Sequence, residues 1–187
     1  MNKSTDAKTI FGIFFRYILL VVIALPNLWL FYTIFTPLTV YPVYFLLNLL
    51  FDASLISNIV IIINQNLPIE IIEACVAGSA YYFLLILNLT TSGIKTKTRI
   101  YMILFSFLVF LAINIIRIFL LSLLAISGSS FFDITHIIFW YALSTLFVIG
   151  IWFIQVKVFR IKEIPVYSDI KFLYKQSKIK NENNKKE

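Results

Sequence analysis

The segment LVFLAINIIRIFLL (residues 108–121) places one arginine, Arg117, among aliphatic side chains, with no acidic residue within ten positions on either side. A run this apolar predicts a helix that lies in lipid. An ionisable side chain in lipid is costly and usually has a functional reason. Arg117 is therefore the first candidate functional residue, and the alternative is that its guanidinium snorkels to the outer headgroups.

The composition of the whole chain agrees with a membrane protein. Hydrophobic residues make up 60% of the 187 residues and charged residues only 13%, whereas soluble domains carry about 25% charged residues. The net charge of +7 would suggest a nucleic-acid partner if it covered one surface. The Lys and Arg residues instead gather in the two termini and one short loop, which is typical of membrane topology signals, so no nucleic acid is expected.

We predict an all-α integral membrane protein with about four transmembrane helices. The apolar stretches that are long enough cover about residues 13–35, 73–91, 100–126 and 137–156. Residues 1–165 would form one transmembrane catalytic domain. Residues 166–187 would form a basic cytoplasmic tail that frays.

Two shorter segments follow the first predicted span. Residues 37–51 are apolar but contain two prolines, which favours a re-entrant or interfacial segment. Residues 58–72 consist of two short apolar runs around the polar turn Asn64-Gln65-Asn66. This pattern predicts a small hairpin on the outer face.

The positions of the basic residues set the orientation. Lys and Arg precede the first span, fill the loop at 92–99 and follow the fourth span, but they are absent from the connections 36–72 and 127–136. The positive-inside rule then places both termini and the 92–99 loop in the cytoplasm. We expect a multi-pass protein of the plasma membrane whose two uncharged-to-acidic connections face outside.

Three unusual residues fall at one depth of this predicted domain. Cys75, the only cysteine, begins the second span at its outer end, and His136, the only histidine, begins the fourth. Arg117 lies about 17 residues into the outward-running third span, roughly 26 Å from the cytoplasmic edge. The three side chains are therefore predicted to meet near the outer face.

This residue set suits acyl transfer from a peptide bond. An apolar site raises the pKa of a thiol, a nearby cation favours the thiolate, and a histidine can carry the proton. A guanidinium can also stabilise the oxyanion of a tetrahedral intermediate. A lone cysteine and a lone histidine exclude a Cys-x-x-Cys redox pair and a multi-histidine metal site, so no metal or organic cofactor is expected.

Three polar neighbours are candidate supporting residues. Asn114 lies one turn inward from Arg117 and is expected to hold its guanidinium. Asp133 lies three residues before His136, where it would orient the imidazole or act as the N-cap of the fourth helix. Glu73 would accept a hydrogen bond from Arg117 or lie at the rim.

Three segments of the chain resemble the motifs of the exosortase and archaeosortase family. They are EACVAGSAYY (73–82), NIIRIFLL (114–121) and THIIFWYALS (135–144), in the family's order and spacing, and the short length is closer to the small archaeal members. The resemblance implies that Cys75 is the nucleophile, His136 the general acid and base, and Arg117 the residue that stabilises the oxyanion. One departure is that many members have a Cys-Ser-Gly-like sequence at Cys75-Val76-Ala77.

The same resemblance implies a substrate class. Such proteins process secreted proteins that end in a short motif, a transmembrane helix and a basic tail. Cleavage near the outer membrane face would release the C-terminal anchor, and the acyl group would pass to a membrane lipid, to another amine or hydroxyl acceptor, or to water.

Two other classes of function remain open from the residues alone. A small transporter or channel subunit would use Arg117 as a binding or gating charge, and an assembly scaffold would pair Arg117 with an acidic residue of a partner helix. A transporter favours polar residues along the full depth of the bundle. The inner halves of the predicted spans are instead nearly all apolar, with Asn88 and Ser106 as exceptions.

Overall fold

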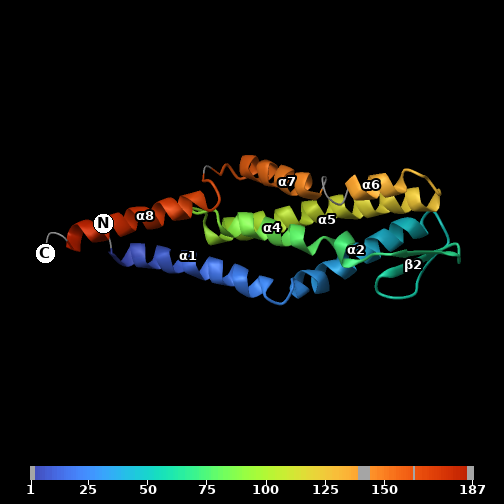
Figure 1. The fold of residues 1–187 in the computed structure, drawn as a ribbon, viewed down its shortest axis with the longest axis horizontal. Helices are drawn as coiled ribbons and strands as arrows, with labels where there is room; N and C mark the ends of the chain where they lie inside the picture. The colour runs from blue at the N-terminus through green and yellow to red at the C-terminus, as the bar shows by residue number, and fades with distance from the viewer. Residues whose placement is uncertain (1–2, 139–143, 162, 185–187) are drawn as a thin grey trace.

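The computed structural model describes residues 3–138, 144–161 and 163–184 and shows an elongated, mostly helical molecule (Figure 1). The described residues form eight helices and one small sheet. The helices are α1 Lys3–Ala24, α2 Trp29–Asn48, α3 Glu73–Val76, α4 Gly78–Leu89, α5 Thr96–Ile126, α6 Phe132–Ile138, α7 Ser144–Val158 and α8 Tyr167–Asn184. The strands are β1 Ala53–Leu55, β2 Val60–Ile63 and β3 Leu67–Glu70.

The longest helix, α5, runs along most of the molecule and contacts α2, α4 and α7 (Figure 1). Its 31 residues correspond to about 46 Å of helix, and the predicted span at 100–126 is confirmed as a helix. The helices α2 and α5 are both long and apolar enough to cross a membrane. Only 33% of the most apolar window of each is buried inside the molecule, so most residues in each window are partly or fully exposed.

The first span, predicted at about 13–35, is not one continuous helix. Pro26 and the left-handed residues Asn27 (φ 49°) and Leu28 (φ 58°) separate α1 from α2. Proline lacks a backbone donor and disfavours helix at the preceding residue, which explains the break at this position.

The segment at 37–51, predicted as re-entrant or interfacial, is not separate from the preceding helix, because residues 37–48 continue α2. Pro37 and Pro42 lie inside this helix. A helix packed among neighbours in a membrane tolerates interior prolines better than a helix in water does.

The predicted hairpin at 58–72 is confirmed as the antiparallel pair β2–β3, in which Ile61 lies opposite Ile69. Its turn has positive φ at Asn64 (50°) and Gln65 (61°), and the N–H of Asn66 donates to the Ile63 carbonyl at 3.2 Å. Positive φ at both central residues is typical of a type I′ turn, and because Ile63 pairs with Leu67, three residues connect the two strands. The sequence pattern did not predict β1, which pairs with β2 and completes a three-stranded sheet.

A buried polar contact joins three helices in the half of the molecule away from the sheet. Gln155 on α7 donates from Nε2 to Asn88 Oδ1 on α4 at 2.7 Å and to the Met102 carbonyl on α5 at 2.6 Å. Asn88 Nδ2 donates to the Leu84 carbonyl at 2.8 Å. Because the donors of these buried amides are satisfied within the bundle, the contact fixes α7 against α4 and α5.

Two arginines close the end of α4. Arg16 on α1 donates to the Leu89 carbonyl at 2.6 Å, and Arg99 on α5 donates to the same carbonyl at 2.7 Å and to that of Thr91 at 2.9 Å. The last carbonyls of a helix have no partner within the helix, so these guanidinium groups act as its C-cap. Arg16 and Arg99 thus join α1 and α5 to the end of α4.

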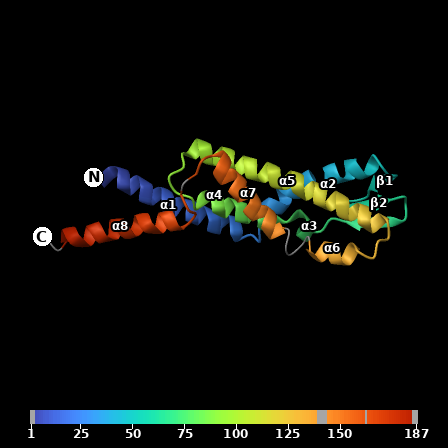
Figure 2. The same cartoon turned by 90° about the horizontal axis from the view of Figure 1, so that it is seen from above.

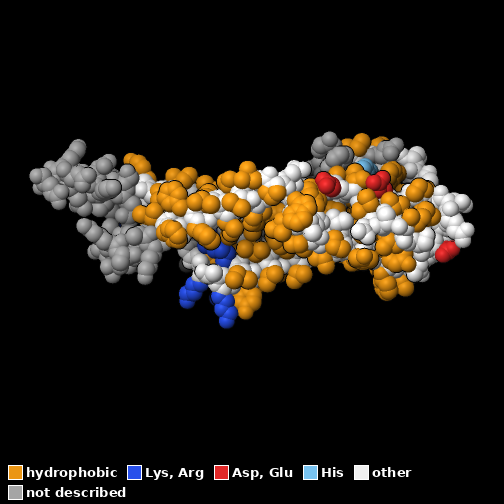
Figure 3. Space-filling view, turned by 90° about the horizontal axis from the view of Figure 1, so that it is seen from below, with side chains coloured by type: hydrophobic (Ala, Val, Ile, Leu, Met, Phe, Trp, Pro, Cys, Tyr) orange, Lys and Arg blue, Asp and Glu red, His pale blue; other side chains and the backbone are white. Residues whose placement is uncertain are grey.

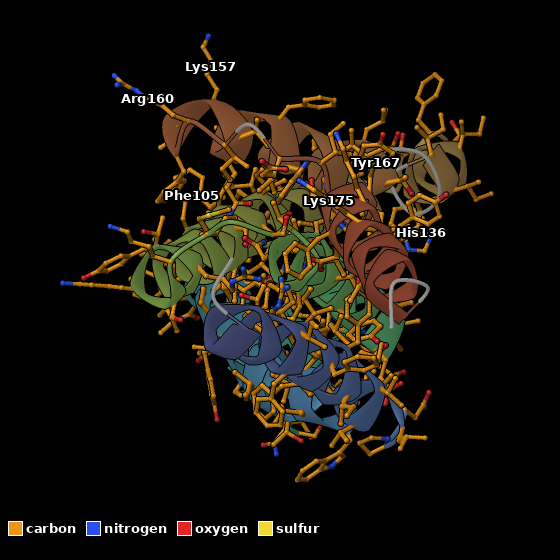
Figure 4. All side chains as sticks on the ribbon, turned by 90° about the vertical axis from the view of Figure 1, so that its left-hand side faces the viewer. Phe105, His136, Lys157, Arg160, Tyr167 and Lys175 are labelled. Carbon is orange, nitrogen blue, oxygen red and sulfur yellow. The ribbon has the colours of Figure 1, made fainter. Side chains whose placement is uncertain are left out.

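The C-terminal tail does not fray over residues 167–184, which form α8. Asp169 of α8 is only 1% exposed and forms a salt bridge with Arg16 at 3.1 Å. The helices α1 and α8 therefore lie together at one end of the molecule, where the chain begins and ends (Figure 2). In the end-on view from the same side, Lys157 and Arg160 point away from the bundle (Figure 4).

We expect Asp169→Asn to loosen the docking of α8. The variant removes the carboxylate charge opposite Arg16 from a buried position, which costs about 1–3 kcal/mol when the arginine keeps other acceptors. Limited trypsin digestion in membranes should then cut faster at Lys171 and Lys175. Glu163→Gln is the control, because it removes the same charge from an exposed position, and equal digestion of both variants would contradict the role of Asp169.

Candidate active site around Cys75

The predicted second span, about 73–91, is interrupted at Ala77, two residues after Cys75. The short helix α3 ends at Val76, and α4 begins at Gly78. Ala77 between them is left-handed, with φ 60° and ψ 47°. An L-residue with a side chain pays about 1–2 kcal/mol for this conformation, so the surrounding contacts must hold the break in place.

Two side chains of α5 hold the backbone at this break. Asn114 Nδ2 donates to the Cys75 carbonyl at 3.0 Å and to the Val76 carbonyl at 3.3 Å. Arg117 Nη2 donates to the Cys75 carbonyl at 2.9 Å. Residues three apart lie on one face of a helix, which is why both reach the same carbonyl.

These bonds correct the prediction for Asn114. Its side-chain oxygen accepts no hydrogen bond, so Asn114 does not hold the guanidinium of Arg117. Both residues instead fix the backbone of Cys75, and both are buried, with exposed fractions of 1% and 6%. The spacing of three residues was the signal in the sequence, but the partner on α3 was not visible there.

Cys75, Arg117 and His136 line one small cavity together with apolar side chains that include Ile118 and Leu121. Its volume of about 20 Å³ is room for roughly one water molecule. The structure therefore brings together the three residues that the sequence placed at one depth. They come from α3, α5 and α6.

The position of His136 differs from the predicted one. It lies in the short helix α6, which follows α5, and its ring stacks on that of Phe132 with centroids 5.6 Å apart. The expected fourth span, 137–156, corresponds in part to α7, which begins at Ser144. Residues 139–143 of that span lie outside the described residues.

The predictions for the other two supporting residues, Glu73 and Asp133, have different outcomes. Glu73 is exposed and forms no salt bridge within the described part of the chain, which agrees with a place at the rim and not with a bond to Arg117. The side chain of Asp133 lies outside the described residues, so its role stays a prediction. The described ranges contain no group of three His, Cys, Asp or Glu residues that would hold a metal ion.

Gly78 allows α4 to start close to α2. A Cβ atom at this position would lie 2.8 Å from the ring of Tyr32, which is closer than real side chains come. A small residue at Gly78 therefore lets α2 approach the start of α4 closely.

We expect Ala77→Gly to stabilise the protein by about 0.5–1 kcal/mol, because glycine adopts a left-handed conformation without steric cost. Ala80→Gly, in the regular part of α4, should destabilise by a similar amount. Thermal unfolding in detergent, followed by tryptophan fluorescence, would show opposite shifts in Tm for the two variants. An equal decrease in both would contradict the strain at Ala77.

Comparison of the chain with protein-family models, curated proteins and solved structures found no match. What the chain does must therefore be argued from the geometry around Cys75.

Proposed function

We propose that this protein is a membrane-embedded cysteine peptidase or transpeptidase of the exosortase and archaeosortase type. The observation that carries the proposal is that α3, α5 and α6 bring Cys75, Arg117 and His136 to one cavity. The substrates would be secreted proteins with a C-terminal motif, a transmembrane helix and a basic tail.

The chemistry would proceed in two balanced steps. The Cys75 thiol gives its proton to His136, and the thiolate attacks the carbonyl carbon of the scissile peptide bond. Arg117 stabilises the oxyanion while the carbon–nitrogen bond breaks, and His136 returns the proton to the leaving amine. A lipid, another amine or hydroxyl group, or water then attacks the thioester, gives its proton to His136 and releases the thiolate.

The same proposal includes four membrane crossings with both termini in the cytoplasm and the site at the outer face. Charge supports this orientation. In the space-filling view, acidic side chains lie beside the histidine, and the Lys and Arg side chains lie towards the opposite end (Figure 3). Three shorter apolar helices at Thr9–Ala24, Glu73–Leu89 and Thr145–Val158 accompany the two long ones.

The buried polar side chains support an enzyme over a transporter. Gln155 donates to the side-chain oxygen of Asn88 and to the Met102 carbonyl, and Asn88 donates to the Leu84 carbonyl, so these amides form a contact between helices. A transport path would need polar groups that face a water-filled space.

The proposal can be tested by trapping the thioester. The protein is co-expressed with secreted proteins of its source genome that carry a C-terminal anchor and a basic tail, and membranes are treated with hydroxylamine. Hydroxylamine attacks a thioester, so the released protein should end in a C-terminal hydroxamate, which mass spectrometry detects. Loss of the anchor without a hydroxamate, at the same rate in membranes that lack this protein, would contradict the proposed function.

A further inference from the structure

One edge of the small sheet is open. In the order β1-β2-β3, β1 packs against α2, and β3 is the opposite edge. The N–H of Ile71 donates to the Ile59 carbonyl on the β2 side at 2.8 Å. Backbone hydrogen bonding alternates along an antiparallel strand. The backbone N–H and C=O groups of the odd-numbered residues of β3 therefore bond to β2, and those of the even-numbered residues point to the open edge.

The even-numbered residues of β3 are Pro68 and Glu70, and both are exposed. By this alternation the N–H of Glu70, which lies opposite Val60, points away from β2. Pro68 has no N–H, so pairing along this edge is possible at Glu70 and stops at the proline. An unpaired N–H at a strand edge forms a hydrogen bond with the backbone of another extended chain when such a chain lies beside it.

The open edge leads directly to the thiol. After Glu70 the chain passes through the buried Ile71 to Ile72, whose carbonyl accepts from the Cys75 N–H at 2.8 Å. Ile72 and Cys75 both line the cavity that also contains Arg117 and His136. A peptide paired at Glu70 would therefore continue towards the cavity.

We propose that the open edge of β3 is the docking strand for the substrate, which adds an extended segment as a fourth strand and so presents its scissile bond to Cys75. This inference rests on the proposed function. The occupant is the unfolded segment between a secreted domain and its membrane anchor, since a folded domain cannot pair along a strand edge.

The charges around the edge set a preference for this segment. Glu70 and Glu73 are exposed, and the chain has no Lys or Arg between Arg16 and Lys95. An acidic segment would be repelled, whereas a neutral or basic segment would be favoured.

Disulfide cross-linking tests the docking without any chemistry. Because Cys75 is the only cysteine, the double variant Glu70→Cys with Cys75→Ala carries one thiol, at the open edge. The probe is a membrane-anchored reporter with single cysteines placed at consecutive positions of its extended segment. Opposed residues of paired strands lie within disulfide reach, and residues two apart share a face, so cross-links should form at alternating positions.

The control is Ser54→Cys with Cys75→Ala, which places an exposed thiol on β1 instead. Equal yields at consecutive positions, no cross-link at all, or equal yields from the Ser54 variant would overturn the docking strand. Alternating cross-links would support it even if the wild type releases no hydroxamate, in which case the proposed chemistry fails alone. Hydroxamate release without alternating cross-links would overturn the docking strand and keep the chemistry.

A proline at the edge gives a second test. Glu70→Pro removes the free N–H and is compatible with an edge strand, so anchor removal should slow by about tenfold or more. Glu70→Gln keeps the N–H and should lose much less activity towards a neutral reporter. Equal rates for wild type and Glu70→Pro would overturn the inference.

Discussion

Cys75→Ala is expected to abolish anchor removal, with a rate at least about four orders of magnitude below that of the wild type. The alanine cannot form the thioester, and no other cysteine exists to replace it. The Cys75 side chain is only partly buried and the substitution removes a single sulfur atom, so the fold should survive. Single-turnover cleavage of the anchored substrate in membranes measures the effect.

Cys75→Ser is the matched variant, because it keeps the size of the side chain and replaces a good nucleophile with a weak one. Its rate should also fall by several orders of magnitude. Wild-type rates in either variant, in protein that resists trypsin as the wild type does, would remove the thiol from the mechanism. The transporter and scaffold hypotheses would then become the better explanations of Arg117.

Arg117→Ala is expected to lower kcat by about 10²–10³-fold, the usual effect of removing one oxyanion donor. The variant also removes the bond to the Cys75 carbonyl that stabilises the break after α3. Arg117→Lys should recover only part of the rate, because an ammonium group keeps the charge but lacks the planar set of donors.

Asn114→Ala separates the two roles of Arg117. It removes the other donor to the Cys75 carbonyl and leaves the charge in the cavity. If Arg117 acts on the oxyanion, Asn114→Ala should lower kcat less than Arg117→Ala does, at a similar loss of thermal stability. Equal losses in kcat would assign Arg117 to backbone positioning only.

The candidate site was largely predictable because it depends on rare residues. One cysteine, one histidine and one arginine within an apolar segment are conspicuous in a chain with 13% charged residues. Counting residues along predicted helices placed the three at one depth, and they line one cavity. The long helix α5 and the hairpin β2–β3 were also predictable, since their hydrophobic runs and polar turn are local signals.

Interruptions of helices were predicted less well. The pattern at 73–91 is continuous and apolar, and nothing local marks Ala77 as left-handed. The break exists because Asn114 and Arg117, about 40 residues further along the chain, supply the hydrogen bonds that the interrupted helix gives up. Proline led to the opposite error. Pro42 suggested an interruption, but it lies within α2, where packed neighbours tolerate it.

The sequence by itself determined the apolar composition, the asymmetry of charge and the identity of the three candidate residues. The tertiary structure alone decided that Arg117 and Asn114 form hydrogen bonds with the Cys75 carbonyl and that Asp169 holds α8 on Arg16. It also decided that β3 is an open edge of the sheet and leads to the thiol. The first two depend on a backbone group or a buried charge whose partner lies far away in the chain, and the third depends on which strands pair. Local hydrophobic pattern carries no information about such partners, because it reports which side chains avoid water and not which polar groups they meet.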